Sequence, residues 1–168
     1  MSSAIDTSTQ TIYIYTDGAC SGNPGRGGYG IILKAGNLLK EISGGFAKTT
    51  NNRMELMAVI KGLEALKNEG SKVVVVSDSK YVTEAINLRW LFNWEKKGWK
   101  KVKNPDLWQR LLQLYRKHDV KFEWVKGHAS HPENERCDEL AVSAIRFGVL
   151  QEDAGFNAAK DVGNLNFM

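Results

Sequence analysis

Several carboxylates in this chain border segments that are otherwise apolar. Asp17 ends the β-branched and aromatic run TIYIYTDG, and Asp78 ends the apolar run KVVVVSDS. Asp138 belongs to ERCDELAVSAI, where it shares a helical stripe with Ala141 and Ile145. A carboxylate in such a position is costly unless a cation or hydrogen bonds compensate for it. If these side chains converge with Glu55 of NNRMELMA, they form a site of hard oxygen ligands suited to Mg²⁺ or Mn²⁺.

Each carboxylate also has a simpler explanation when it is taken alone. Asp17 begins an Asp-Gly pair, which is common in turns, and Asp78 could cap the helix that follows it. Glu55 could complete a capping box begun by Asn52. Asp138 could pair with an arginine of its own helix, although neither arginine lies at the favoured spacing of three or four residues. The metal-site hypothesis therefore depends on all four side chains meeting in space.

The surrounding pattern predicts the elements that would bring them together. Strands are expected for TIYIYTDG, for about 29–34 and 38–46, for KVVVV and for 120–125. Helices are expected for 49–69, from 80 onward, within 84–103, for 106–118 and for 131–147. The first three strands suggest an antiparallel start. The complete order predicts an α/β layer fold, a mixed sheet covered by helices.

Length and composition indicate one ordinary globular domain. The 168 residues are 42% hydrophobic and 25% charged, and no apolar run is long enough to cross a bilayer. Two widely separated cysteines and a start without an apolar signal segment favour a reducing compartment, so we expect a cytoplasmic protein. We expect residues 1–10 to be a flexible leader, 11–147 the domain, and 148–168 a C-terminal tail.

The positive charge is concentrated in one segment. Between Arg89 and Lys103 there are six basic residues and one acidic residue, a local charge of +5, whereas the rest of the chain sums to −1. Tryptophans 90, 94 and 99 are interleaved with these charges. Such a segment on a near-neutral body indicates a surface that binds a polyanion.

Four blocks of the chain resemble the type I ribonucleases H in order and spacing. They are DGACSGNPGRGGYG, TTNNRMELMA, SDSKYV and WVKGHASHPENERCDELA, and the likeness extends over about residues 11–151. The resemblance implies a five-stranded mixed sheet flanked by helices. It also implies a monomeric endonuclease that hydrolyses the RNA strand of RNA/DNA hybrids, leaving 5′-phosphate and 3′-hydroxyl ends.

The resemblance assigns a role to individual residues. It places the catalytic and metal-binding carboxylates at Asp17, Glu55, Asp78 and Asp138, where they would hold two Mg²⁺ ions (or Mn²⁺) once substrate is bound. The flexible histidine of the family falls on His128. For the substrate, the resemblance places four small and amide residues near the RNA 2′-hydroxyls: Cys20, Asn23, Asn51 and Asn52. It implies a DNA-phosphate pocket formed by Lys48, Thr50 and Asn104, and further substrate contacts from Lys80 and Trp90.

The chain departs from the family pattern in three places. Lys48 stands where the family often has Arg, which keeps the charge but loses the bidentate fork. Lys80 stands where a Gln is common, and the loop after Trp99 is shorter and has fewer lysines than in many relatives. These changes affect expected substrate affinity and salt dependence rather than the chemistry.

Two other kinds of function remain open at this point. Integrases, transposases and resolvases use similar acidic metal sites, but they generally lack the NNRMEL block and the basic segment with its tryptophans. A non-catalytic module that binds hybrid or double-stranded RNA is the alternative from another class. All four carboxylates are present, which favours the enzyme.

Overall fold

The computed structural model describes residues 10–127 and 131–156, and these form one α/β domain. The elements follow in the order β1 (Ile12–Ser21), β2 (Gly25–Ala35), β3 (Leu38–Thr49), α1 (Asn51–Glu64), β4 (Lys72–Ser77), α2 (Lys80–Asn87), α3 (Trp90–Lys96), α4 (Pro105–Tyr115), β5 (Asp119–Trp124) and α5 (Pro132–Phe147).

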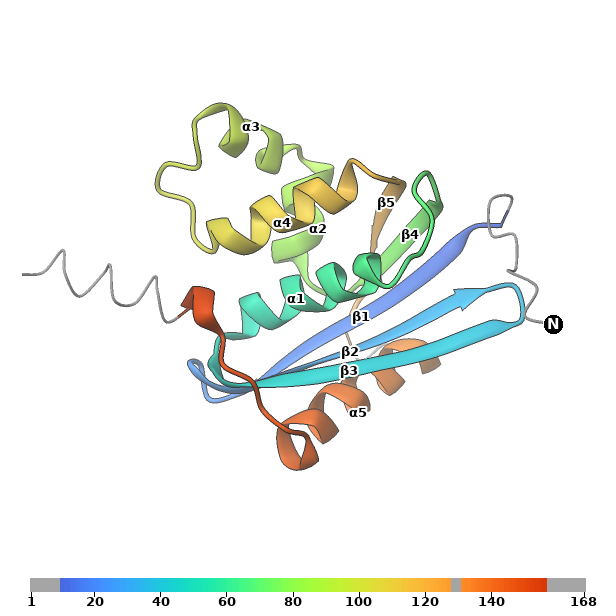
Figure 1. Cartoon of the computed structure of the whole chain (residues 1–168), viewed down its shortest axis with the longest axis vertical. Coiled ribbons are helices and arrows are strands. Elements are labelled where there is room, and N and C mark those ends of the chain that lie inside the picture. Colours follow the sequence, from blue (N-terminus) through green and yellow to red (C-terminus); the bar gives the residue numbers. More distant parts are fainter. Residues whose placement is uncertain (1–9, 128–130, 157–168) are drawn as a thin grey trace, which may run out of the picture.

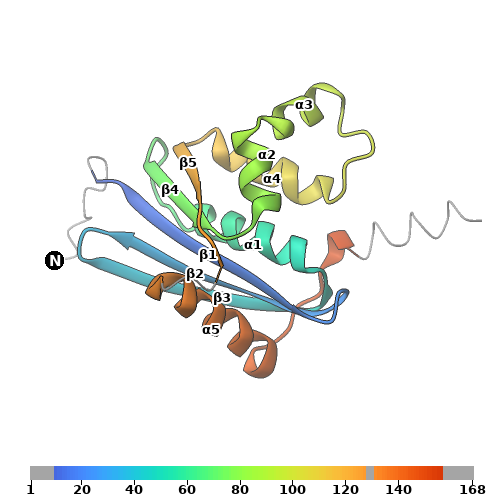
Figure 2. The same cartoon turned by 180° about the vertical axis from the view of Figure 1, so that it is seen from behind.

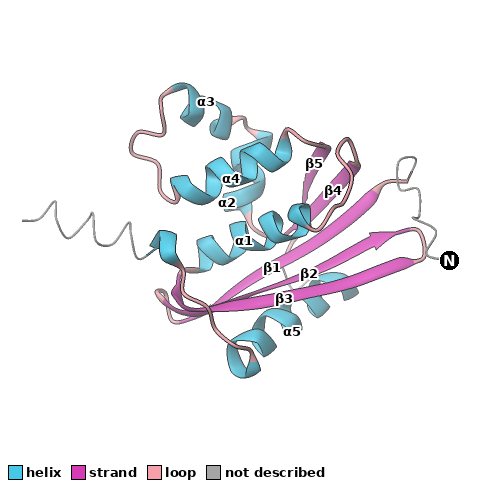
Figure 3. Cartoon of the chain, in the orientation of Figure 1, coloured by secondary structure: helices cyan, strands magenta, loops and turns pink. Residues whose placement is uncertain are grey.

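The sheet is mixed, as the sequence predicts. Its strand order is β3-β2-β1-β4-β5, with antiparallel pairing from β1 to β3 and parallel pairing of β1 with β4 and of β4 with β5 (Figures 1 and 3). The two parallel neighbours, β1 and β4, therefore end at the same edge of the sheet. Ligands of open α/β sheets bind at this carboxyl edge.

Helices cover both faces of the sheet. α1 packs on one face over β1 and β2, α2 contacts β4 and β5, α4 packs on α1 and α3 on α2, and α5 covers the opposite face over β1, β2 and β3 (Figures 1 and 2). The core between the sheet and α1 is apolar and fully buried, with Ile14, Ile31, Leu56, Ile60 and Val75 at its centre. Along β1, fully buried residues alternate with exposed or partly buried ones, which is the period of two of a strand.

Several element boundaries differ from the prediction. α1 begins at Asn51 rather than at residue 49, because Thr49 still belongs to β3 and Thr50 caps the helix through its side chain. The helix ends at Glu64, well before the predicted end at residue 69. β2 begins at Gly25, because the glycine-rich residues after it pair with β3 and Arg26 pairs with Ser21. α4 ends at Tyr115 rather than at residue 118.

The chain continues along the domain after α5. Gln151 pairs with β3: its backbone N–H donates to the Gly45 carbonyl (3.0 Å) and its carbonyl accepts from the Ala47 N–H (2.8 Å). Asp153 follows and is only 4% exposed. The first part of the expected tail, up to Phe156, therefore packs on the domain, while residues 1–9 and 157–168 lie outside the described part of the chain. Within residues 10–127 and 131–156, no helix is long and apolar enough to cross a membrane.

Candidate active site

The four carboxylates meet at the carboxyl edge of the central strands. Asp17 comes from β1, Asp78 follows β4, Glu55 lies on α1, and ligand oxygens of these three lie within 4.8 Å of one another. Asp138 reaches the same place from α5 and is within hydrogen-bonding reach of Asp17. All four line one hollow of about 320 Å³, together with Gly18, Asn51 and Ser79.

Two glycines allow this close approach. A Cβ atom on Gly18 would lie 2.5 Å from the backbone nitrogen of Glu55, so only glycine lets β1 pack this closely against the start of α1. The Gly18 N–H donates to Asp17 Oδ1 (3.0 Å) and to Glu55 Oε1 (3.1 Å). On the other side, a Cβ atom on Gly127 would lie 2.8 Å from Asp78 Oδ2. The backbone therefore comes close to Glu55 at Gly18 and to Asp78 at Gly127.

The structure argues against the simpler explanations for the acidic residues of the strands. Asp17 lies within β1, which continues to Ser21, so it does not form a turn. The cap of α2 is Ser79, whose hydroxyl accepts from the Val82 N–H (3.3 Å), so Asp78 is not the cap.

The two helical carboxylates also lose their simpler explanations. α1 is capped by Thr50 rather than by Asn52, so Glu55 is not the third residue of a capping box. The nearest arginine to Asp138 along the chain, Arg136, binds Glu41 and Glu139 instead.

Burial and mutual repulsion make this cluster unfavourable when ionised. Burial, followed by the charges of Asp78 and Asp138, raises the pKa of Asp17 to about 8. Burial and the charges of Asp17 and Asp78 likewise raise the pKa of Glu55 well above its usual range. Glu55 Oε2 is buried and has no hydrogen-bond partner among residues 10–127 and 131–156. An orphaned carboxylate oxygen that faces further carboxylates is what a hard divalent cation requires, so the residues present fit a metal such as Mg²⁺.

This electrostatic cost leads to a prediction for the metal-free protein. Because folding raises the pKa of Asp17, this carboxyl is ionised in the unfolded chain above about pH 4 but stays protonated in the folded protein until about pH 8. The difference lowers the free energy of unfolding, and the loss grows between these two pH values. Asp17→Asn removes it, so the variant should gain up to about 4 kcal/mol in free energy of unfolding at pH 7, at about 1.4 kcal/mol per pKa unit. Denaturant unfolding in EDTA at pH 4, 6 and 8 measures the gain. A gain that does not grow with pH would contradict this explanation.

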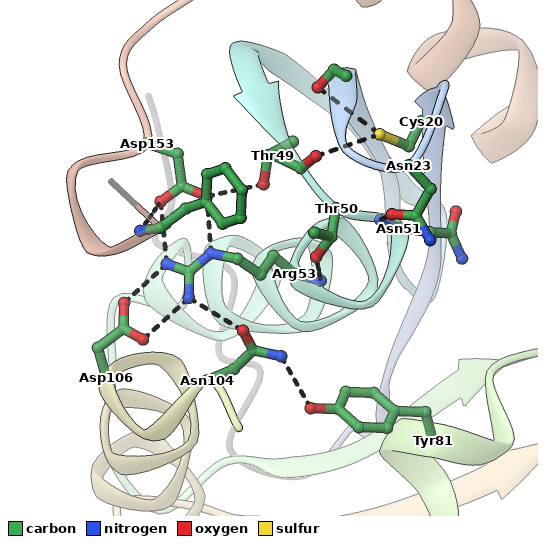
Figure 4. A network of polar contacts seen from close by, with 12 residues as sticks. Cys20, Asn23, Thr49, Thr50, Asn51, Arg53, Tyr81, Asn104, Asp106 and Asp153 are labelled. Atoms are coloured by element: carbon green, nitrogen blue, oxygen red, sulfur yellow. Dashed lines mark hydrogen bonds and ion pairs between the residues drawn. The ribbon is translucent and has the colours of Figure 1, made fainter. Parts of the chain in front are cut away.

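The expected contacts to the RNA strand lie beside the hollow. Asn51 lines it, and its backbone N–H is held by Asn23 Oδ1 (3.1 Å). Asn52 is exposed next to it, in the first turn of α1. Cys20 is half-buried, and its thiol donates to the Thr49 carbonyl (3.5 Å). The structure therefore brings these residues together around the start of α1 (Figure 4).

The expected DNA-phosphate residues lie farther along the same side. Thr50 accepts from the Arg53 N–H (3.3 Å) through its hydroxyl. Asn104 lies between two partners, accepting from Arg53 Nη1 (3.2 Å) and donating to the Tyr81 hydroxyl (3.0 Å) (Figure 4). Lys48 is exposed at the end of β3.

The tryptophans of the basic segment have different surroundings. Trp90 is 43% exposed and available for a ligand. Trp94 packs edge-on against the buried Trp108, with ring centroids 5.3 Å apart, so it anchors α3 to the core.

Of the histidines, only two can be placed. His128, the expected flexible histidine, lies outside the described residues. His131 precedes α5 without a side-chain cap and lines a second hollow with Asp17, Asp78 and Asp138. His118 instead accepts the Ser71 N–H through Nδ1 (3.3 Å).

The sequence interpretation missed an ionic network behind the site. Arg53 is 1% exposed and binds Asp153 (Nε to Oδ2, 2.7 Å) and Asp106 (Nη2 to Oδ2, 2.7 Å), and Thr49 donates its hydroxyl to Asp153 (2.7 Å) (Figure 4). One signal was available, because Arg53 stands on the apolar stripe that continues with Leu56 and Ile60. A charge at such a position requires buried partners.

Comparisons with known proteins agree with this geometry. The family model described as RNase H matches residues 9–146. Over 150 residues the chain is 54% identical to the "Ribonuclease H" of Syntrophus aciditrophicus, covering 86% of each chain, and 55% identical to that of Escherichia coli, covering 86% of this chain and 95% of the relative.

Solved structures give the same result. LC9-RNase H1, described as a type 1 RNase H with the type 2 active-site motif, superposes with a TM-score of 0.74 at 31% identity, covering 90% of this chain and 81% of that one. LC11-RNase H1 in complex with an RNA/DNA hybrid gives a TM-score of 0.60 at 30% identity, covering 80% of this chain and 96% of that one.

Proposed function

Because the chain belongs to the ribonuclease H family, we propose that its four converging carboxylates hydrolyse the RNA strand of RNA/DNA hybrids with the help of two divalent metal ions. The observation that carries the proposal is the meeting of Asp17, Glu55, Asp78 and Asp138 in one hollow, with a buried Glu55 oxygen that has no hydrogen-bond partner in the described part of the chain. Such a group is satisfied by a cation rather than by another part of the chain.

Each carboxylate has a place in this mechanism. Bound divalent ions supply an activated water and neutralise the charge that develops on the leaving 3′-oxygen. Asp17 lies between the other carboxylates, within reach of both Glu55 and Asp138, and is therefore the residue that both ions would share. Asp78 and Asp138 would each bind on one side of it. Glu55 would bind one ion and face the 2′-hydroxyl side of the substrate, where Asn51 lines the hollow.

Choice of the RNA strand requires contacts to 2′-hydroxyl groups across a wide minor groove. Asn51 and Asn23 are hydrogen-bonded to one another beside the hollow, and Asn52 and Cys20 are their neighbours. Small and amide side chains at this place can approach the sugars closely. We assign the reading of the RNA strand to these four residues.

The DNA strand would be bound on the side of α4. Lys48, Thr50 and Asn104 would hold one of its phosphates, and the exposed face of Trp90 would contact a sugar. The segment with a charge of +5 would add sequence-independent attraction to the backbone. His128 would assist proton transfer or departure of the product.

Further properties follow from the resemblance and are part of the same proposal. We expect Mg²⁺ as the natural ion, with Mn²⁺ able to replace it, and a monomeric enzyme that acts in the cytoplasm. We also propose that residues 11–147 contain the catalytic unit, with 1–10 as a leader and 148–168 as a C-terminal extension.

A substrate panel tests this function. Labelled RNA/DNA hybrid, double-stranded RNA, double-stranded DNA and single-stranded RNA are each incubated with Mg²⁺, with Mn²⁺ and with EDTA. We expect cutting only of the RNA in the hybrid, and only with metal. If the hybrid is bound but stays intact in both metals, the chain is a binding module and the proposed reaction is wrong.

A further inference from the structure

An exposed tryptophan lies next to the acidic hollow without being part of the core. Trp124 is the last residue of β5 and is 42% exposed. Its indole Nε1 donates to the backbone carbonyl of Asp78 (2.9 Å), and the two strands that carry these residues are paired in parallel, with Ser77 opposite Trp124. The indole is therefore fixed to the turn that presents one of the four carboxylates.

A lysine is held against the face of this ring. The Lys80 ammonium lies 4.9 Å from the centroid of the Trp124 ring, within the range of a cation–π contact. Among the described residues, Lys80 forms no ion pair with a carboxylate. Its ammonium and the exposed ring are thus both open to a ligand.

The position of this lysine is not explained by the stability of its own helix. Lys80 is the first residue of α2, and a positive charge at a helix N-terminus opposes the helix dipole. The neighbouring residue Ser79 already caps the helix and lines the acidic hollow. A cation held at this place by an aromatic ring is better explained by an anion that binds there.

We propose that Lys80 and Trp124 form a clamp for a phosphate of the RNA strand, adjacent to the bond that is cut. The clamp rests on the proposed function, because Trp124 is hydrogen-bonded to Asp78 on the rim of the acidic hollow in which the RNA strand would be cut. Lys80 binds the phosphate, and Trp124 is a positioning residue that restricts the lysine side chain and holds the Asp78 turn. A preorganised ammonium loses less side-chain freedom on binding than a free one.

Salt dependence separates this role from a purely structural one. Cleavage of RNA/DNA hybrid in Mg²⁺ is measured for Lys80→Gln over a range of KCl concentrations. Loss of one phosphate contact should raise KM about five- to tenfold at low salt, leave kcat within about twofold, and reduce the slope of log KM against log salt by about 0.7–0.9. Lys72→Gln, an exposed lysine at the opposite end of β4, is the matched control and should keep the parental slope.

Variants of the tryptophan test the coupling between the two residues. Trp124→Leu should raise KM in the parental protein but add little in the Lys80→Gln background. Trp124→Phe, which keeps a ring face, should restore most of the affinity. A slope for Lys80→Gln equal to that of Lys72→Gln, with active parental enzyme, would overturn the clamp alone. Inactive parental enzyme would instead refute the proposed function.

Discussion

Replacing Asp17 by asparagine should lower the rate of hybrid cleavage in Mg²⁺ by about 10³-fold or more, which corresponds to a loss of about 4 kcal/mol of transition-state stabilisation. Asp17 lies within reach of both Glu55 and Asp138, and its oxygens belong to the cluster that can hold a cation. A neutral amide keeps the shape of the side chain but removes the charge that the ions require. On the proposed function both ions would share Asp17, so the remaining carboxylates would not replace it.

The result is informative because the variant should remain folded. Asp17→Asn relieves repulsion in the metal-free protein and should therefore be more stable than the parental chain, so unfolding cannot account for lost activity. Single-turnover cleavage with enzyme in excess measures the chemical step. Asp119→Asn changes an exposed aspartate at the start of β5 and should cleave like the parental enzyme. If Asp17→Asn keeps more than about a tenth of the parental rate, Asp17 is not a shared metal ligand.

The second large effect concerns stability rather than chemistry. Arg53→Met should lower the free energy of unfolding by about 3–5 kcal/mol, because it leaves a buried carboxylate without its partner. Asp153 is 4% exposed and receives two hydrogen bonds from the guanidinium (2.7 and 2.9 Å). Methionine fills much of the same volume, so the loss reports the charge and hydrogen bonds. For a chain of this length the melting temperature should fall by about 10 °C.

An exposed ion pair of the same type provides the control. Arg116 binds Glu95 through two hydrogen bonds (2.6 and 2.7 Å), but these side chains are 53% and 38% exposed rather than buried. Arg116→Met should therefore cost less than about 1 kcal/mol in urea unfolding. If the two variants lose the same free energy of unfolding, the buried network around Arg53 stabilises the fold no more than an exposed ion pair does.

The part of the fold that the sequence could predict is the part with local signals. β1 and β4 contain β-branched runs that lead into Asp17 and Asp78, and α5 has Pro132 in its first turn. Hydrophobic period and turn residues are properties of neighbouring positions, so they are visible in the sequence. The start of α1 was misplaced by two residues because Thr49 and Thr50 are both suitable caps, and only pairing with β3 decides between them.

The features that the sequence did not reveal depend on partners far along the chain. Asp153 binds Arg53 from 100 positions away, and Trp124 binds Asp78 from 46 positions away. Neither the residue types nor the local spacing indicates such a pair. The convergence of Asp17 with Glu55 likewise depends on Gly18, whose missing side chain lets β1 approach the helix. The sequence pattern and the resemblance both single out the four carboxylates, but the reason they can meet is visible only in the structure.

The measurement that tests the account most directly is an analysis of the ends of the cleaved RNA. Hybrid with a 5′-labelled RNA strand is incubated with the parental enzyme and Mg²⁺, and the product ends are identified by enzymatic extension and phosphatase treatment. Water attack assisted by the carboxylate-bound metal ions predicts 3′-hydroxyl and 5′-phosphate ends, an intact DNA strand, and no products in EDTA. Products that end in a 2′,3′-cyclic phosphate, or hybrid left intact with Mg²⁺, would contradict it.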